Sequence, residues 1–242
     1  MSGLYHDVGV VLRTYKLRES DKIVVVHTRD HGKVRAVAKG VRKTRSRFGA
    51  RLEPMSHVKL LLYQGRELDI VSQAEAIEPL SPMLSSLDRA SQGLAALEAV
   101  DQLSLEREPN PQLYKMLVGV LRTIASKPAP LNVPAFYWKL LAREGFHPQL
   151  DTCVRCHEAE PAVSLVAFDL NEGGVLCRSC RSGQAISPAA LGLLRDILGG
   201  RLQHALDQEE SPATHEVSSL ATKALEFQIE RRLRAVAMFE AH

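Results

Sequence analysis

The four cysteines of this 242-residue chain are the residues best suited to chemistry, and they form two Cys-x-x-Cys pairs. Twenty residues separate Cys156, the end of the first pair, from Cys177, the start of the second. A Cys-x-x-Cys turn points both of its sulfurs at one centre, and two such turns complete a tetrahedron around Zn²⁺. Four thiolates leave no coordination position open for catalysis. The spacing therefore predicts one structural Zn²⁺ per chain, with the ligands Cys153, Cys156, Cys177 and Cys180.

Three other uses of these cysteines remain open. Two disulfides require an oxidising compartment, and the first residues show neither the basic segment nor the apolar core of an export signal. A thioredoxin-like redox centre uses one pair and leaves the other unexplained. An iron–sulfur cluster also takes four thiolates, although paired turns more often hold zinc. His147 and His157 flank the first pair, but four cysteines make a histidine ligand unnecessary.

The basic residues are concentrated near the N-terminus. Residues 1–51 carry thirteen Lys and Arg against four Asp and Glu, a net charge of +9, whereas residues 52–242 carry 18 against 24, a net charge of −6. Such asymmetry indicates a polyanionic partner for the basic part. No apolar run approaches the roughly 20 residues that a membrane helix needs, so we expect a cytoplasmic protein.

Five short segments rich in Val and Ile predict β-strands in the N-terminal third. They span residues 8–15, 23–28, 33–39, 58–63 and 67–72. Gly32 can adopt the positive φ that the loop between the second and third segments requires. Five strands with a break after the third fit the Greek-key barrel of the OB-fold, although an SH3-like barrel or an open sheet would show nearly the same pattern.

The break between the third and fourth strands is strongly basic. Residues 39–51, here called the basic loop, contain six Lys and Arg and no acidic residue. Cationic side chains gain affinity for nucleic acids by releasing counterions from phosphates, and Phe48 offers a ring on which a base could stack. The alternative is a solvated loop without a ligand. The predicted DNA contacts, which would not read sequence, are Lys33, Arg35, Lys39, Arg42, Lys43, Arg45, Arg47 and Arg51. Lys16 and Arg18 rank second because acidic residues stand beside them.

After a proline-rich segment near residue 80, the hydrophobic period changes from two to about 3.6, which indicates helices. We predict them from Met83 to Glu106, from Pro111 to Ile124, from Pro134 to Glu144, from Pro188 to Gly199-Gly200, and from Pro212 to Glu240. The prediction is an α+β chain with an OB-fold domain at residues 1–79, an α-helical domain at 80–150 and 186–242, and a Cys₄ zinc module inserted at 151–185. Trp138 is expected to anchor the helical core against the zinc module.

Enzymatic motifs are missing from the sequence. It contains no Gly-x-x-x-x-Gly-Lys-Ser/Thr phosphate loop and no Gly-x-Ser-x-Gly nucleophile elbow. Asp169 and Glu172 lie in a predicted loop with no evident partner. We therefore interpret the chain as a binding protein and not an enzyme. An RNA- or ribosome-associated OB-fold zinc protein and a metal-dependent nucleic-acid hydrolase are the alternatives.

Several motifs between Asp7 and Cys180, about three quarters of the chain, also carry a resemblance to a known family. They are Asp7-Val8-Gly9-Val10-Val11-Leu12, Glu19-Ser20-Asp21-Lys22-Ile23, His31-Gly32-Lys33, Lys39-Gly40-Val41-Arg42, Arg51-Leu52-Glu53-Pro54, Phe136-Tyr137-Trp138-Lys139-Leu140-Leu141, Gly145-Phe146-His147-Pro148, and Gly173-Gly174-Val175-Leu176-Cys177 with both cysteine pairs. In these motifs the chain resembles the RecO family of bacterial DNA repair proteins. His157 departs from the family pattern, because glycine commonly follows the second cysteine.

The resemblance implies a recombination mediator with an N-terminal OB domain, a helical domain and a zinc module. Members of the family bind single- and double-stranded DNA, anneal complementary strands, associate with RecR, contact the single-stranded-DNA-binding protein and help to load the RecA recombinase. A nucleoid-associated protein is therefore expected. Because some members lack the cysteines, the resemblance also implies that the activity does not depend on zinc chemistry.

Overall fold

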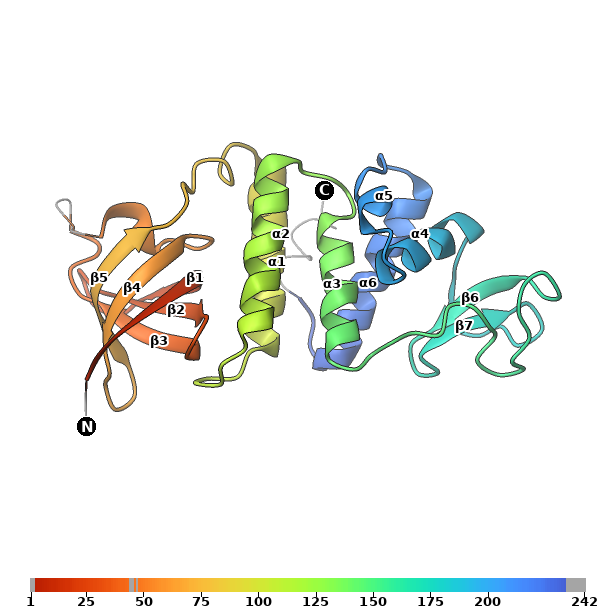
Figure 1. Ribbon diagram of the computed structural model, residues 1–242, viewed down its shortest axis with the longest axis horizontal. Coiled ribbons are helices and arrows are strands. Elements are labelled where there is room, and N and C mark those ends of the chain that lie inside the picture. The colour runs from red at the N-terminus through yellow and green to blue at the C-terminus, as the bar shows by residue number, and fades with distance from the viewer. Residues whose placement is uncertain (1–2, 44–45, 47, 234–242) are drawn as a thin grey trace. The chain divides into compact units, whose positions relative to one another are not determined.

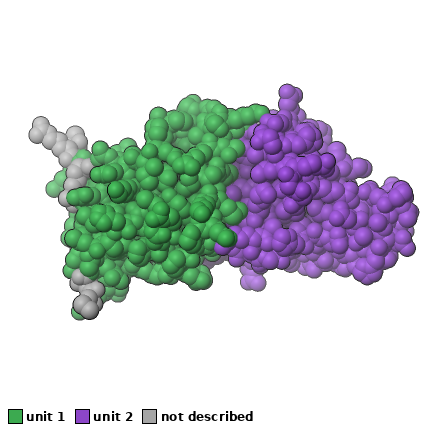
Figure 2. Space-filling model, viewed as in Figure 1, with its two compact units in different colours: residues 1–128, 237–242 green, residues 129–236 purple. Residues whose placement is uncertain are grey.

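The structure is a computed structural model that describes residues 3–43, 46 and 48–233. It divides into two compact units after Pro128, shown in different colours in Figure 2, and each unit is described by itself below. Helices α1 and α2 belong to the same unit as the N-terminal strands. The predicted domain limits remain a prediction. No helix among the described residues is both long enough and apolar enough to cross a membrane.

Five strands of the first unit close into a barrel (Figure 1). They are β1 (Leu4–Lys16), β2 (Lys22–Thr28), β3 (Gly32–Ala38), β4 (His57–Tyr63) and β5 (Asp69–Ala76). Their order is β1-β2-β3-β5-β4, and β4 pairs with β1 to complete the circle. Every pair is antiparallel except β3 and β5, which meet in a short parallel contact. The closed five-stranded barrel confirms the predicted OB-like fold and excludes an open sheet.

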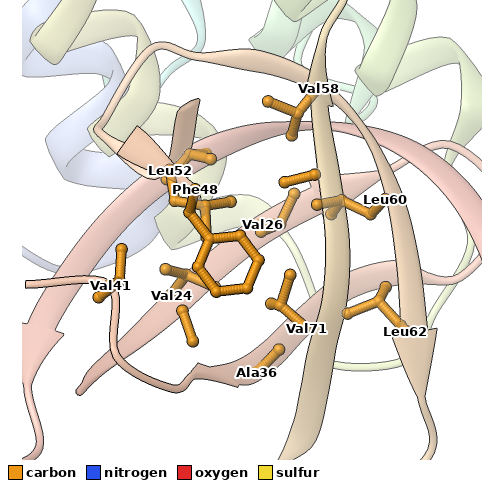
Figure 3. Close-up of a cluster of buried hydrophobic side chains, with 13 residues drawn as sticks. Val24, Val26, Ala36, Val41, Phe48, Leu52, Val58, Leu60, Leu62 and Val71 are labelled. Atoms are coloured by element: carbon orange, nitrogen blue, oxygen red, sulfur yellow. The ribbon is translucent and has the colours of Figure 1, made fainter. Parts of the chain in front are cut away.

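The barrel core contains side chains that alternate along the strands, as the period of two requires. Val24 and Val26 from β2 and Leu60 and Leu62 from β4 point inward and are at most 1% exposed (Figure 3). Phe48 also lies in this cluster with 1% exposure. The prediction that Phe48 offers a free ring to a base is therefore wrong. The short 3-10 helix η1 (Gly49–Leu52) begins directly after it, and a large apolar ring gains more from burial than from exposure.

A helical hairpin packs on the outside of the barrel within the same unit. Its helices are α1 (Leu87–Leu103) and α2 (Pro111–Ser126), and the side chains of Ser86 and Asn110 cap their first turns. Helix α1 is shorter than predicted at both ends, because the chain before Ser86 forms turns and Ser104 takes an extended conformation.

The second unit combines four helices with a small sheet. Its helices are α3 (Asn132–Arg143), α4 (Pro188–Leu198), α5 (Leu202–Leu206) and α6 (Pro212–Ile229), and its strands are β6 (Leu165–Asp169), β7 (Gly174–Cys177) and β8 (Gln184–Ala185). The prediction missed α5 and the three strands. Helix α6 ends at Ile229 and not at Glu240, because Glu230 adopts the left-handed conformation with φ 52°; residues 234–240 lie outside the described residues.

Trp138 joins α3 to the small sheet, as predicted. Its side chain is 0% exposed, and its ring lies 5.9 Å from Phe168 of β6 in an edge-on contact and 6.4 Å from Phe146 in a stacked one. The neighbouring Phe136 and Tyr137 are buried as well. The single tryptophan therefore reports on the packing between α3 and the cysteine-bearing segment.

Candidate metal centre and nucleic-acid interface

The structure brings all four cysteine sulfurs together. One Sγ atom from each of Cys153, Cys156, Cys177 and Cys180 lies within 4.8 Å of the other three, and the sulfurs of Cys156 and Cys177 are 3.7 Å apart. A tetrahedral metal with bonds of about 2.3 Å to sulfur needs sulfur atoms about 3.8 Å apart. The four thiols thus fit a closed tetrahedral site. Neither His147 nor His157 belongs to the group.

Backbone hydrogen bonds shape the first Cys-x-x-Cys turn, here called knuckle 1. The amide of His157 donates to the carbonyl of Cys153 at 2.8 Å, and the amide of Val154 donates to Val175 of β7 at 2.9 Å. His157 adopts φ 63°, a left-handed conformation that favours glycine. The chain thus places a histidine, and not a glycine, in a backbone conformation that side chains rarely adopt.

Arg155 connects knuckle 1 to the second Cys-x-x-Cys turn, here called knuckle 2. Its guanidinium donates to Glu172 at 2.8 Å, to the carbonyl of Cys180 at 3.1 Å and to Ser182 at 3.0 Å. Ser182 in turn donates to the buried carboxylate of Asp169 at 2.7 Å. Both Asp169 and Glu172, for which the sequence showed no partner, thus brace the two knuckles. Only the tertiary structure reveals this role, because the partners lie 13 to 27 residues apart.

The thiols differ in how readily they ionise. Burial opposes ionisation of Cys153, but the backbone amides of Cys156, Cys177 and Arg155 outweigh it and lower the pKa of Cys153 to about 6. Contact with the thiol of Cys177, followed by burial, raises the pKa of Cys180 to about 12. Negative charges crowded into one small site repel one another. A bound cation relieves this repulsion, which is a further reason to interpret the cluster as a metal site.

The predicted DNA contacts lie mostly on exposed surface of the barrel. Arg35, Lys39, Arg42, Lys43 and Arg51 are exposed. Arg45 and Arg47 lie outside the described residues. The structure therefore places one predicted contact on β3 and the other four in the basic loop.

Lys33 is the exception, because its ammonium group turns toward α1. It donates to the backbone carbonyl of Asp101 at 2.6 Å and lies 3.3 Å from the Asp101 carboxylate, with only 12% of the side chain exposed. Arg13 approaches the same carboxylate at 2.8 Å. Two cations thus hold the buried Asp101, which fastens the C-terminal end of α1 to the barrel. These contacts favour a structural role for Lys33.

A set of short hydrogen bonds clips the basic loop to the β1–β2 loop, residues 17–21. The amide of Gly40 donates to Asp21 at 2.7 Å, and this bond is the main reason why the pKa of Asp21 lies below its usual range. Arg42 donates from its amide to Ser20 at 3.0 Å and from its guanidinium to the carbonyl of Glu19 at 2.9 Å. The nearby cations Arg18 and Lys39 also lower the pKa of Asp21, by a smaller amount. The clip brings the second-rank candidates Lys16 and Arg18, both exposed, close to the basic loop.

One exposed aromatic side chain on the same barrel escaped the sequence analysis. Tyr15 near the end of β1 is 42% exposed, and the guanidinium carbon of Arg13 lies 5.0 Å from the centre of its ring. An aromatic residue two positions after an arginine in a predicted strand was the available signal, since alternate residues share a face.

Comparisons with known proteins point to one family. The family model "Recombination protein O N terminal" matches residues 1–80, and "Recombination protein O C terminal" matches residues 84–237. A DNA repair protein RecO from Frankia casuarinae is 42% identical over 243 residues, which cover 98% of each chain. A DNA repair protein RecO from Nocardioides sp. (strain ATCC BAA-499 / JS614) is 41% identical over 243 residues, which cover 98% of this chain and 99% of the relative.

Proposed function

Because the chain belongs to the RecO family of DNA repair proteins, we propose that it is a non-enzymatic mediator of DNA repair and recombination. In this proposal it binds single- and double-stranded DNA through the basic part of its barrel and anneals complementary strands. With RecR it helps to load RecA onto strands coated with the single-stranded-DNA-binding protein. It acts in the cytoplasm, associated with the nucleoid. The observation that carries the proposal is the group of exposed cations in the clipped loops.

Annealing follows from electrostatics without any bond being made or broken by the protein. Two complementary strands repel each other through their phosphates, and a cationic surface lowers this repulsion by displacing condensed counterions. The side chains of Lys39, Arg42 and Lys43 suit this task because they contact phosphates and carry no base information. The base edges then stay free to pair. Arg35 and Arg51 extend the proposed surface, and Arg45 and Arg47 remain predicted contacts.

Zn²⁺ is the metal that we assign to the cysteine cluster, one ion per chain. Four thiolates at tetrahedral distances and no open position suit a structural zinc. When bound, the ion supplies cross-links between the two knuckles and no reaction chemistry. Arg155 and Asp169 hold the same segments together through hydrogen bonds.

A strand-annealing assay across a salt series tests the proposal. Complementary strands coated with their binding protein are mixed with the wild-type chain or with the double variant Lys39→Glu, Arg42→Glu. We expect the variant to lose most of its annealing and its logarithmic salt slope for single strands to fall by about 1.4, since each lost phosphate contact removes about 0.7.

The matched control is Lys59→Glu with Lys115→Glu, which changes the net charge equally at two exposed lysines elsewhere in the same unit. Unchanged affinity of the Lys39/Arg42 variant at low salt would refute the assignment of the basic loop. A preference for RNA in competition, without annealing of DNA, would favour the RNA-associated alternative. Metal-dependent turnover of labelled DNA would show an enzyme instead.

A further inference from the structure

The outer face of β1, β2 and β3 carries a row of apolar side chains that the barrel core does not use. Cross-strand pairing places Tyr15 opposite Ile23, and Ile23 opposite Val37. Their sequence neighbours Val24 and Ala36 point into the core, so these three side chains point outward. Tyr15 is exposed, and Ile23 and Val37 are half-buried. The result is an open apolar row with an aromatic ring at one end.

Cations lie on the side of this row that faces α1. The next outward row contains Arg13 and Arg35, one on each side of Val25. Arg13 is held at 2.8 Å by Asp101, and its guanidinium lies 5.0 Å from the centre of the Tyr15 ring. Arg35 lies 3.8 Å from Glu106. The ring of Tyr15 is thus positioned by a cation that is itself anchored.

More cations lie on the other side, at the end of the barrel. Lys16 is exposed as the last residue of β1, and the exposed Lys39 follows Val37 by two residues, in the turn directly after β3. Arg42 and Arg18 belong to the clipped loops just beyond. A flat apolar row with cations along both sides matches a polymer that presents flat rings from a chain of negative charges. Single-stranded nucleic acid has this chemistry, whereas a duplex hides its base faces.

We propose that Tyr15 is a base-stacking platform for single-stranded DNA, with Ile23 and Val37 extending its apolar surface and Arg13 fixing the ring. The site deepens the proposed function and rests on it: the basic loop binds phosphates of either kind of DNA, and Tyr15 gives single strands an additional contact. Stacking on an aromatic ring tolerates every base. The platform therefore distinguishes single strands from duplex by their accessible base faces, and it does not distinguish one sequence from another.

The variants Tyr15→Ala and Tyr15→Phe test the platform on the full-length protein. Affinities for an oligothymidine and for a duplex of equal length are measured over a salt series. We expect Tyr15→Ala to weaken single-strand binding about tenfold, within the range for loss of one stacked base, and to change duplex binding less than twofold. Tyr15→Phe retains wild-type affinity because it keeps the ring. The salt slope stays unchanged, since no phosphate contact is lost.

Tyr63→Ala is the matched control, because Tyr63 is 40% exposed on β4 of the same barrel, and thermal unfolding shows that each variant is folded. Photo-crosslinking of an oligonucleotide carrying 5-iodouracil provides a second readout, with the adduct expected on Tyr15.

Equal single-strand binding by wild type and Tyr15→Ala would overturn the platform alone. Absence of DNA binding by the wild type would overturn the proposed function itself. Equal losses on single strands and duplex would assign Tyr15 to barrel integrity or general contact, against the proposal.

Discussion

The barrel and the segment that carries the cysteines are both small β-structures, and they are held together by different means. The barrel core contains thirteen buried apolar residues, which come from all five strands, from the basic loop and from Leu52 directly after it. Residues 151–185 contain only five buried apolar side chains besides two of the cysteines. So small a core stabilises a fold poorly, and we therefore expect the cysteine segment to depend on cross-links through the proposed metal. The barrel needs none, and its outer surface can carry charges and exposed rings.

Metal removal gives the largest expected difference between the two regions. Replacing Cys153 with Ser removes a buried ligand, and structural zinc contributes roughly 10–16 kcal/mol to the folding of small modules. We expect the variant to lose its metal and the packing of the second unit. Tryptophan emission measures this directly, because Trp138 contacts Phe168 of β6. Ser179→Ala, inside knuckle 2 but not a ligand, serves as control.

DNA affinity decides what this result means. The barrel is expected to bind DNA whether or not the cysteine segment holds metal, since its core is separate. A soluble, zinc-free variant with a selective loss of DNA binding would contradict the interpretation of the cluster as a structural clamp.

Truncation of Phe48 is the corresponding test on the barrel. Phe48→Ala leaves a cavity in the core and is expected to lower the free energy of unfolding by about 3–5 kcal/mol. Denaturant unfolding followed by circular dichroism measures the loss, and metal content and tryptophan emission should stay as in the wild type. Lost DNA affinity with unchanged stability would instead show that Phe48 contacts bases.

Acid is expected to weaken the barrel through His27. This side chain is 0% exposed, and burial, with a smaller contribution from Lys33, lowers its pKa to about 4, against about 6.5 in an unfolded chain. Between about pH 6.5 and pH 4, the unfolded state therefore binds a proton at His27 that the folded state does not bind. The contribution of neutral, buried His27 to the free energy of unfolding is complete above about pH 6.5. It is lost as the pH falls toward 4, which lowers this free energy by about 3 kcal/mol.

Hydrogen exchange of β2 and β3 amides between pH 7 and pH 4 measures this effect after correction for intrinsic exchange rates. Exchange of these amides measures the stability of the barrel alone, which matters because metal binding by the cysteines is also sensitive to acid. His27→Gln should make barrel stability less dependent on pH. An unaltered pH profile in that variant would assign the acid sensitivity to other groups.

The smallest expected effect concerns Arg155, whose hydrogen bonds would supplement the proposed metal. Arg155→Ala removes bonds to Glu172, Ser182 and the carbonyl of Cys180. Because the side chain is 43% exposed and solvent screens its contacts, we expect only a small loss of stability. Competition with a chromogenic chelator should show faster release of metal, with DNA binding unchanged. Identical release rates in wild type and variant would show that the metal alone joins the knuckles.

Local sequence patterns were sufficient for the barrel strands, for most of the helix starts and for the grouping of the four cysteines. Alternating Val and Ile predicted all five barrel strands, and Asn110-Pro111 and Ser211-Pro212 marked helix starts to within a residue. The Cys-x-x-Cys spacing predicted a cluster that the structure confirms, since each knuckle is a single turn whose geometry follows from neighbouring residues. The strands β6 and β7 were missed, because β7 has only four residues and contains one of the ligands.

What the sequence by itself determined about this protein is therefore its α+β class, its barrel, the cluster of four cysteines and the basic character of its first 51 residues. Only the tertiary structure decided which of these side chains are available. In the folded chain Phe48 is buried, and Lys33 forms a hydrogen bond with Asp101. Arg155 connects the two knuckles by hydrogen bonds, and Tyr15 is exposed beside Arg13. The physical reason is that periodicity and turn spacing arise from neighbours in the chain. Burial and ion pairing arise from residues that folding brings together from distant positions.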